Sequence, residues 1–410
     1  MLLFRVFSIP VRFFIALLIY FSWGPLAGGV VTAPVPEFSS PALIPYPSKV
    51  VRGAGEAGFR SVHVKVGSDV PGRDDLMKEI KDIFRTSGIQ GSLNSGGAAE
   101  GAMTWELFPD ARMKGEGYDL SVGLGKATVR AGSFGGFFNA LQTLRQLVFN
   151  REGEFAMPVV RISDKPAFVL RGIMLDVGRY YMSPALIKDV MRRLSRYKIN
   201  TLHLHLTDDP AWRLEVKKYP ALTDGAFHWK SRLPGRFYTQ AQLKDLTDYC
   251  ARLNIQVIPE IDMPGHSQPF ARAMKTGMQT EKGVSILKDV VDEAVSLFPG
   301  RFFHMGSDEA HISMKDFIPR MAEHIRGKGK EVVVWSPGGP HDKDSVLMCW
   351  GENEAGARMD KNMKRIDSNG FYIDWADSQS GVYQVFFQQP CEVPQGDDKA
   401  LGAIMPVWCD

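Results

Sequence analysis

From residue 166 onward, short apolar runs alternate with stretches in which apolar residues recur every three or four positions. The runs are rich in β-branched and aromatic residues, which is typical of buried parallel strands. Eight runs follow one another, at 168–176, 201–206, 255–262, 302–309, 331–336, 346–351, 369–374 and 403–409. Helical patterns such as SPALIKDVMRRLSRYK separate them, and Ser183 and Pro184 suit the start of that helix. Residues 166–410 therefore predict an α/β fold, a closed (β/α)8 TIM barrel.

The chain stops at Asp410, directly after the eighth run. A complete barrel has an eighth helix there, so we expect this helix to be missing. Either the sequence is truncated, or another element or subunit covers the groove. A homo-oligomer would be one such cover for the open barrel end.

Three segments precede the barrel. Residues 46–165 combine β-rich pieces with two helical stretches, DDLMKEIKDIFRTSG and GGFFNALQTLRQLVF, and predict a small α+β domain. Residues 30–45 are rich in Pro, Ser and Ala and predict a linker. Residues 1–29 place arginines around an apolar run that ends before small residues, which is typical of a signal peptide. The run is shorter than the roughly 20 residues of a spanning helix.

The leader predicts export to the periplasm or the extracellular space, without a stable membrane span after cleavage. An uncleaved anchor is the alternative. The formal net charge of +3 and the lack of a dense Lys/Arg block argue against a nucleic-acid partner. The 4 cysteines show no C-x-x-C spacing, so they predict neither a disulfide framework nor a thiolate metal site.

The chemistry of a TIM barrel lies at the carboxyl ends of its strands. The residues at these ends are mainly carboxylates and large aromatic rings, with few cations. Ring faces cover the apolar face of a sugar, and carboxylates accept hydroxyl protons, so the set suits a neutral polyhydroxylated ligand. The candidates are Asp176, Arg179, Thr207, Asp208, Asp209, Asp262, His266, Asp308, Glu309, Trp335, Trp350, Tyr372, Asp374, Trp408 and Asp410.

The stretch FFHMGSDEA makes Asp308 and Glu309 neighbours in the chain. Most glycosidases face two carboxyl groups across the scissile bond, about 5 Å apart for retention and roughly 6.5–9.5 Å for inversion. Successive strand residues point to opposite faces, so these neighbours cannot easily form such a facing pair. The usual two-carboxylate arrangement therefore does not explain this motif.

Three ordered motifs carry a resemblance to a known family. They are RGIMLDVGRYYMSPALIKDVMRRLSRYKINTLHLHLTDDPAWR, IPEIDMPGH and FHMGSDE. Together they resemble glycoside hydrolase family 20, the β-N-acetylhexosaminidases, from about Pro45 to the end. The resemblance implies an exo-acting hydrolase that needs no cofactor or metal. It would release terminal GlcNAc or GalNAc, with net retention, from chitin fragments or glycoconjugates.

The resemblance also implies a mechanism that explains the neighbouring carboxylates, because the substrate's own acetamido oxygen is the nucleophile. Glu309 matches the acid/base, which would work in a dry, aromatic-lined pocket. Asp308 matches the carboxylate that accepts the acetamido N–H and offsets its developing positive charge. One carboxylate would thus act at C1 and the other at the substituent on C2.

Further positions match groups that bind the sugar. Arg171 matches an arginine for the 3- and 4-hydroxyls, although its place inside a strand also suits a salt bridge within the barrel. Asp208 and His266 match a polar network that supports Glu309. The remaining matches are a tyrosine for the acetamido carbonyl, three tryptophan walls and two outer carboxylates: Tyr372; Trp335, Trp350 and Trp408; Asp374 and Asp410.

Departures and alternatives remain open on the sequence. The family usually has glutamate where Asp410 stands, which would change contacts with the 4- and 6-hydroxyls. The stretches after His266 and Glu309 are short for the family, which implies an open pocket. His203 and His205 form an H-x-H pair, as in metal-dependent barrel hydrolases. A degenerate carbohydrate-binding barrel with little turnover is another alternative.

Overall fold

The structure is a computed structural model that describes residues 42–93, 99–151, 153–350, 360–372 and 388–409. The predicted leader at 1–29, most of the predicted linker, Asp374 and Asp410 lie outside these residues. All described residues belong to one compact unit. None of the helices within these ranges is long and apolar enough to cross a membrane.

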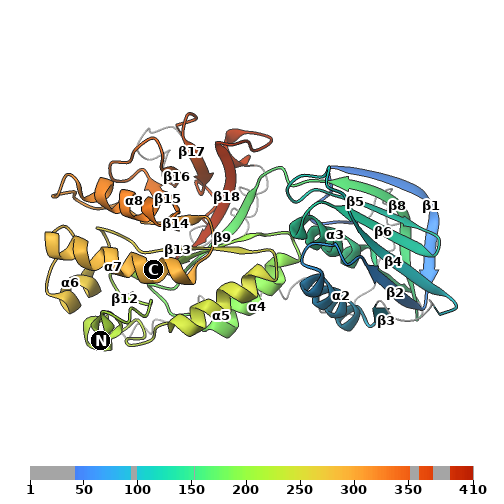
Figure 1. Ribbon diagram of the computed structural model, residues 1–410, viewed down its shortest axis with the longest axis horizontal. Helices are drawn as coiled ribbons and strands as arrows, with labels where there is room; N and C mark the ends of the chain where they lie inside the picture. The colour runs from blue at the N-terminus through green and yellow to red at the C-terminus, as the bar shows by residue number, and fades with distance from the viewer. Residues whose placement is uncertain (1–41, 94–98, 152, 351–359, 373–387, 410) are drawn as a thin grey trace, which may run out of the picture. The chain divides into compact units, whose positions relative to one another are not determined.

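The first part of this unit is a mixed sheet with two helices on one of its faces (Figure 1). The helices are α2 (Arg73–Ser87) and α3 (Phe134–Leu147), and they also contact each other. The alternating burial of strand residues leaves the opposite face to solvent. In order across the sheet, the strands are β1 (Lys49–Phe59), β8 (Glu154–Asp164), β5 (Tyr118–Gly123), β6 (Lys126–Ala131), β4 (Ala102–Pro109), β2 (Ser61–Val66) and β3 (Gln90–Leu93), with β7 (Phe149–Arg151) beside β8.

The second part is a closed barrel of eight parallel strands, which confirms the predicted TIM barrel. β18 pairs with β9 and so closes the ring. A short hairpin of β11 (Thr207–Asp208) and β12 (Ala211–Trp212) follows the second barrel strand. The barrel strands are β9 (Leu170–Asp176), β10 (Thr201–His205), β13 (Gln256–Glu260), β14 (Phe302–His304), β15 (Glu331–Ser336), β16 (Val346–Cys349), β17 (Lys364–Asp367) and β18 (Ala400–Val407).

Two predicted strands differ from the observed ones. The seventh strand is β17 at 364–367, and the prediction of a strand at 369–374 was wrong for its described residues. Three of the four β17 residues are charged, so no apolar run marks this strand, although Arg365 and Asp367 are buried. The fourth strand ends at His304, because the chain turns at Gly306 instead of continuing to Glu309.

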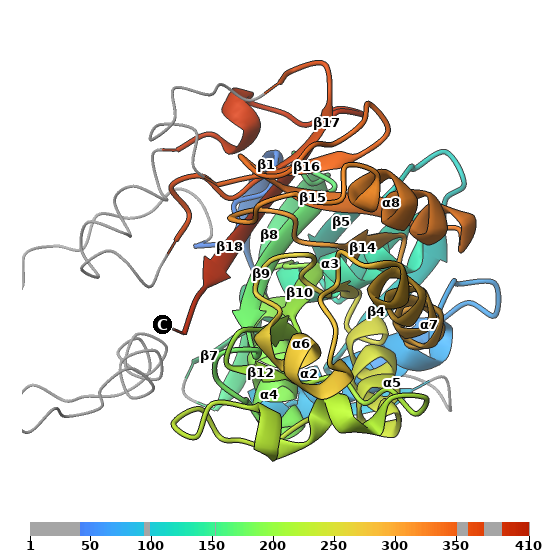
Figure 2. The ribbon, with the colours of Figure 1, turned by 90° about the vertical axis from the view of Figure 1, so that its left-hand side faces the viewer.

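Helices cover the barrel unevenly. Those that follow the first four strands are α4 (Pro184–Ser195), α5 (Gln240–Ala251), α6 (Gln268–Met274), α7 (Glu281–Leu297) and α8 (Phe317–Gly327). In the ranges that the structure describes, no α-helix follows β15, β16 or β17, as Figure 2 shows. The Ser183 side chain caps α4 by accepting the Leu186 N–H, and Thr239 with Gln242 forms a capping box on α5. Short 3₁₀ turns lie at η1 (Pro220–Thr223), η2 (Gly225–Phe227) and η3 (Pro390–Glu392).

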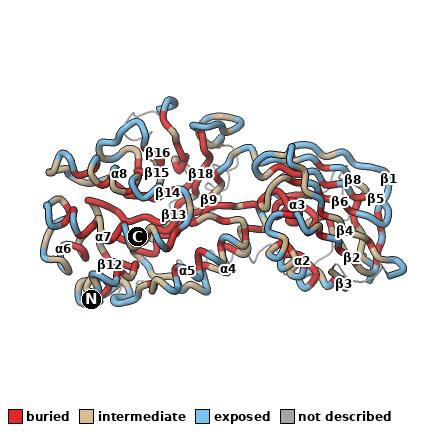
Figure 3. Tube along the Cα trace, in the orientation of Figure 1, coloured by how far each residue is buried: buried red, intermediate tan, exposed pale blue. Residues whose placement is uncertain are grey.

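A cluster of buried apolar residues lies in the barrel, and Figure 3 shows the barrel strands as largely buried. Inward residues such as Met174, Ile258 and Val333 form this cluster. Trp335 belongs to the same cluster, and Trp350 and Trp408 pack on it while staying partly exposed. These three rings lie at or just after the carboxyl ends of β15, β16 and β18. The aromatic residues predicted for the site therefore cover this end of the core.

Candidate active site

Three side chains, those of Asp208, His266 and Glu309, lie in a row in which each contacts the next. Asp208 Oδ1 lies 3.4 Å from His266 Nδ1, and His266 Nε2 lies 3.4 Å from Glu309 Oε2. The hydrogen bond to Asp208 raises the pKa of His266 to about 9, against the opposing effect of burial. His266 is therefore an imidazolium at neutral pH and presents an N–H to Glu309. The three residues come from β11 and the loops after β13 and β14, so the barrel brings distant motifs together.

The two neighbouring carboxylates sit in different surroundings. Burial, followed by the negative charge of Glu260, raises the pKa of Asp308 to about 7. The Glu309 side chain is 59% exposed. This exposure differs from the dry surroundings expected for Glu309, and fits a site that is open when no substrate covers it. The pair thus combines one carboxylate held in the protein with one that faces outward.

The backbone between β14 and Glu309 explains how neighbours take such different positions. Gly306, Ser307 and Glu309 have φ values of 65°, 84° and 46°, so the segment is a left-handed turn and not a strand. A Cβ on Gly306 would lie 1.9 Å from Asp262 Oδ1, so only glycine fits there. Non-glycine residues in this conformation are strained, and such strain often accompanies a functional site.

The aromatic residues form a linked group around Trp408. Its ring centroid lies 5.8 Å from that of Trp335 and 6.4 Å from that of Tyr372. Trp335 is only 1% exposed, so it can form the inner wall of the site but little of its open surface. Trp350 is partly exposed, and its indole N–H donates to the Pro337 carbonyl at 3.0 Å. The structure thus brings the predicted rings together at one end of the barrel.

Arg171 lies elsewhere and has to be corrected as a site residue. It is the second residue of β9, and its guanidinium binds Glu116 at 2.5 Å and the Lys198 and Phe168 carbonyls. These partners lie at the amino end of the strand and in the sheet domain, away from Asp308. Arg171 does form a salt bridge, but its partner Glu116 lies in the sheet domain and not within the barrel as the alternative had it. The strand separates Arg171 from the carboxyl end, where the site lies.

Arg179, eight residues later in the same motif, occupies the site instead. It ion-pairs with Asp176 and with Asp208, each at 3.1 Å. Its guanidinium carbon lies 4.7 Å from the ring centroid of Trp408. Arg179 was one of the residues expected at the strand ends, whereas the hydroxyl-binding role had been expected for Arg171.

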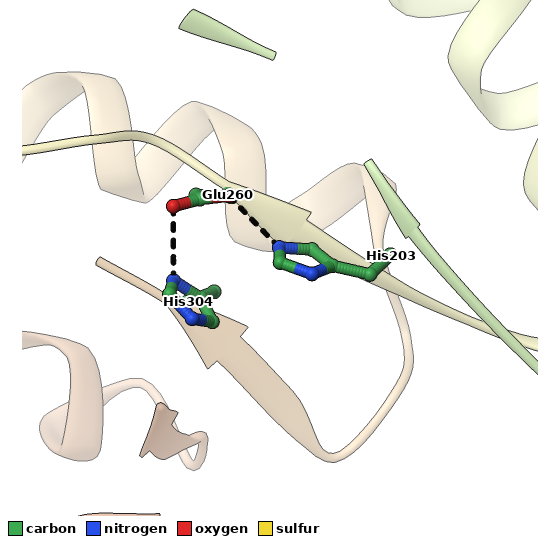
Figure 4. A group of neighbouring side chains, drawn as sticks. All are labelled: His203, Glu260 and His304. Carbon is green, nitrogen blue, oxygen red and sulfur yellow. Dashed lines mark ion pairs between the residues drawn. The ribbon is translucent and has the colours of Figure 1, made fainter. Parts of the chain in front are cut away.

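A second group was missed by the sequence reasoning. Glu260, at the end of β13, is fully buried and lies 2.9 Å from His203 Nε2 and 3.2 Å from His304 Nδ1 (Figure 4). Its oxygens also accept from His205 Nδ1 at 2.7 Å and from Trp335 Nε1 at 2.7 Å. Two features of the sequence could have indicated this group. His203 and His205 lie on one face of their strand, and a glutamate stands at the end of the next strand.

This geometry also bears on the metal alternative. Several groups of His, Asp and Glu have atoms close enough to hold a cation, and one is His203, Glu260 and His304. His205, however, places Nδ1 against Glu260 and Nε2 against Asp208 at 2.9 Å. Both nitrogens are therefore donors in hydrogen bonds, which leaves the H-x-H pair with one imidazole at most for a metal. In this arrangement His205 lies between two carboxylates, whereas burial lowers the pKa of His203 to about 4, so the His203 imidazole is neutral at pH 7.

Comparisons with known proteins agree with this fold. Residues 168–314 match the model "Glycosyl hydrolase family 20, catalytic domain", and residues 40–165 match "Glycosyl hydrolase family 20, domain 2". A Beta-hexosaminidase of Porphyromonas gingivalis is 32% identical over 325 residues, covering 64% of this chain and 41% of that protein. A Beta-hexosaminidase of Vibrio furnissii is 29% identical over 372 residues, covering 72% of this chain and 61% of that protein.

Solved structures give the same picture. A mutant Streptomyces plicatus beta-hexosaminidase in complex with the product GlcNAc is similar with a TM-score of 0.77 and 26% identity, covering 89% of this chain and 85% of that one. The chain spans less than two thirds of the length of the two curated relatives above. Because both domain models of one family match in order, and the barrel and sheet domain have the same fold as the solved relative, this chain belongs to glycoside hydrolase family 20.

Proposed function

We propose that this protein is an exo-acting β-N-acetylhexosaminidase that uses the acetamido group of its substrate as the nucleophile. The observation that carries the proposal is the left-handed turn that holds Asp308 inside the site and Glu309 at its mouth, with His266 beside Glu309. The names of the relatives, and the GlcNAc product bound by the Streptomyces plicatus enzyme, support the substrate class.

In the first step, the acetamido carbonyl oxygen attacks C1 and the bond from C1 to the glycosidic oxygen breaks. Glu309 gives its proton to that oxygen, and the aglycone leaves. The products are the free alcohol and a cyclic oxazolinium-type intermediate. Asp308, as a carboxylate, accepts the acetamido N–H and balances the positive charge on the nitrogen. The imidazolium of His266 stabilises the carboxylate that the proton transfer leaves on Glu309.

In the second step, water attacks C1 from the face that the aglycone vacated. Glu309 takes a proton from this water, and the bond from C1 to the acetamido oxygen breaks. The sugar is released with its β configuration, because C1 has been inverted twice. No second enzyme carboxylate needs to face Glu309, so the two groups can be neighbours in the chain.

Binding of one terminal sugar follows from the residues around this centre. The rings of Trp335, Trp350 and Trp408 supply apolar surface for the acetamido methyl group and the sugar face. In this proposal Tyr372, whose ring centroid lies 6.4 Å from that of Trp408, donates to the acetamido carbonyl. Arg179, instead of Arg171, is suited to bind ring hydroxyls, because it lies over Trp408 and is held by two carboxylates.

The leader segment belongs to the same proposal, since glycans of other cells and of chitin lie outside the cytoplasm. We infer that residues 1–29 direct export and are then removed. Amino-terminal sequencing of the protein recovered from its native cells would give a start after about residue 29 if this is right, and a start at Met1 if the segment is an uncleaved anchor.

The test of the activity compares paired chromogenic substrates, a β-N-acetylglucosaminide and the matching β-glucoside, with and without EDTA. Cleavage of the acetamido sugar alone, at a rate that EDTA does not change, is expected. Glu309→Gln is the matched control and should lose most of its rate on acetamido substrates with poor leaving groups while still binding GlcNAc.

Three results would contradict the proposal. Equal cleavage of both sugars would exclude the acetamido group as the nucleophile. Loss of activity in EDTA would favour the metal-dependent alternative built on His203. Binding of GlcNAc without turnover in the wild-type chain would favour the carbohydrate-binding barrel.

A further inference from the structure

Glu260 occupies the centre of the barrel end and is not one of the groups expected to touch the substrate. It is completely buried; its two oxygens accept hydrogen bonds from Trp335 and His205, and they lie within 3.2 Å of nitrogens of His203 and His304. Burying an ionised carboxylate is costly unless it is paired, so such a group is retained only where its partners repay the cost. The arrangement of those partners indicates what Glu260 does.

One arm of this group leads to the acid/base residue. Glu260 Oε2 accepts from His205 Nδ1 at 2.7 Å, and His205 Nε2 donates to Asp208 Oδ2 at 2.9 Å. Asp208 then contacts His266, which contacts Glu309. The chain therefore alternates carboxylate, imidazole, carboxylate, imidazole and carboxylate over five residues from three motifs. Removing the charge of Glu260 therefore changes the electrostatic environment of Glu309.

A second arm leads to the aromatic wall. The Trp335 indole N–H donates to Glu260 Oε1 at 2.7 Å. A third arm leads to the turn, because His304 Nδ1 lies 3.2 Å from Oε1 and accepts the Gly306 N–H at 3.0 Å. Glu260 thus contacts His205, which leads to the acid/base through Asp208 and His266. It also contacts Trp335 of the aromatic wall and His304, which binds the turn that carries Asp308.

We propose that Glu260 is a positioning residue that holds His205 protonated and Trp335 in place, and so couples the Asp208–His266–Glu309 chain to the aromatic wall. This inference rests on the proposed function. It deepens that function by naming the buried group on which proton delivery to the leaving oxygen depends. The environment of His205 agrees with it, because the charge of Glu260 raises the pKa of that imidazole well above its ordinary value against the effect of burial.

The test uses Glu260→Gln, which keeps the volume and one oxygen for the Trp335 N–H but removes the charge beneath His205. Rates are measured on two β-N-acetylglucosaminides, one with an alkyl aglycone that needs a proton to leave and one with a dinitrophenyl aglycone that does not. We expect kcat/KM, which reports the step in which the aglycone leaves, to fall by about tenfold or more on the first and by less than about threefold on the second. Binding of GlcNAc should change little, because the Trp335 contact is kept.

Two further variants make the result specific. Trp335→Phe removes the hydrogen bond from the indole N–H to Glu260. This variant should raise KM without changing the ratio of the two rates. Glu79→Gln is the matched control. Glu79 is also buried and paired, with Arg145 and Arg192, but it lies on α2 of the sheet domain. It should lower the thermal midpoint and leave the ratio of the two rates unchanged.

An equal loss on both substrates in Glu260→Gln, or no loss on either, would overturn the inference while the wild-type activity upholds the proposed function. A wild-type chain that cleaves neither substrate would overturn the proposed function, and this inference with it. If Glu260→Gln does not fold, His205→Gln breaks the same link at its next member. The same selective loss is then expected, and an equal loss would again overturn the inference.

Discussion

The two arginines of RGIMLDVGR are chemically identical but lie at opposite ends of one strand. Arg179 contacts Asp208 and the face of Trp408, whereas Arg171 ties the barrel to Glu116. We expect Arg179→Lys to raise KM for a β-N-acetylglucosaminide by about tenfold, because lysine cannot reproduce a bidentate, stacked guanidinium. Arg171→Lys should leave KM unchanged and lower the thermal midpoint. Steady-state kinetics and thermal unfolding of both variants check this pair.

The result that would contradict the assignment is the reverse pattern, with KM raised by Arg171→Lys and unaffected by Arg179→Lys. Either variant can be compared with Arg193→Lys, because the Arg193 side chain forms an exposed pair with Asp189 on α4. That variant should change neither KM nor the midpoint.

Asp308 gives a pH dependence whose sign follows from its surroundings. Burial and then the charge of Glu260 raise its pKa to about 7, above the ordinary value of 3.8. The folded state therefore favours the protonated form, and stability is lost as pH rises through the folded pKa. Asp308→Asn, which is permanently neutral, should raise the thermal midpoint by several degrees at pH 8 and leave it unchanged below about pH 4. The same variant should lose at least about 100-fold in kcat, because it carries no charge to balance the acetamido nitrogen.

Thermal unfolding at both pH values and single-substrate kinetics test this combination. A midpoint that falls at pH 8 would show that the Asp308 carboxylate stabilises the fold. Asp308→Asn is thus expected to raise the thermal midpoint at pH 8 and to lower kcat. This combination is typical of a residue that serves catalysis at a cost to the stability of the fold.

At the residue scale, the sequence reveals which side chains reach a strand end but not which partner each one meets. Asp208, His266, Asp308 and Glu309 were predicted because they follow strands, and the structure brings them together. Glu260 was missed because it lies inside a strand run, where an ionised group is normally excluded. Its importance depends on three histidines from other strands, and no local pattern specifies that meeting.

At the scale of elements, the turn after β14 decides where both carboxylates point. Gly306→Ala would place a Cβ 1.9 Å from Asp262 Oδ1 and force a non-glycine residue to φ 65°. We expect this variant to lose about 2 kcal/mol or more of stability and most of its activity, because the turn must move. Denaturant unfolding and kinetics measure the two effects.

Gly327→Ala is the matched control for that prediction. Gly327 ends α8, and a Cβ there would meet no atom within 4 Å. Alanine is favoured over glycine in a helix, so this variant should keep its activity and its stability. Equal losses in both variants would mean that the turn has no special constraint.

The elements themselves were predicted unequally. The apolar runs of β9, β10, β13, β15 and β16 identified those strands, because both faces of each are covered. β17 reads as Lys-Arg-Ile-Asp, and only its place between β16 and β18 makes it a strand. Its Arg365 and Asp367 are buried by tertiary contacts, which override the weak strand propensity of charged residues.

At the scale of the whole unit, buried charges join the sheet domain to the barrel. Glu79 and Asp82 on α2 pair with Arg145 on α3 and with Arg192 on α4 of the barrel. Glu116 contacts Arg171, Asn200 and Asn254. Ion pairs of this kind require both partners in place, so the two parts should unfold together in one transition.

Lys198 provides the sharpest test of this coupling. It is 4% exposed at its side chain, and its ammonium donates to Asp164 at 3.0 Å and to Tyr118 Oη at 2.9 Å, both in the sheet domain. Lys198→Met leaves Asp164 as a buried, uncompensated charge, and breaking a buried pair in this way costs about 3–5 kcal/mol. The free energy of unfolding should fall by that amount, and adding Asp164→Asn should recover part of the loss.

Lys244→Met is the control, because Lys244 and Asp248 form an exposed pair on α5 whose loss should cost less than about 1 kcal/mol. Below the unfolding transition, kcat of Lys198→Met should equal that of the wild type, since the partners of the Lys198 ammonium, Asp164 and Tyr118, lie in the sheet domain. An unchanged unfolding free energy would show that the sheet domain is not held by this charge. A loss of kcat in the folded variant would mean that the sheet domain also shapes the site through β10, because Lys198 lies only three residues before that strand begins at Thr201.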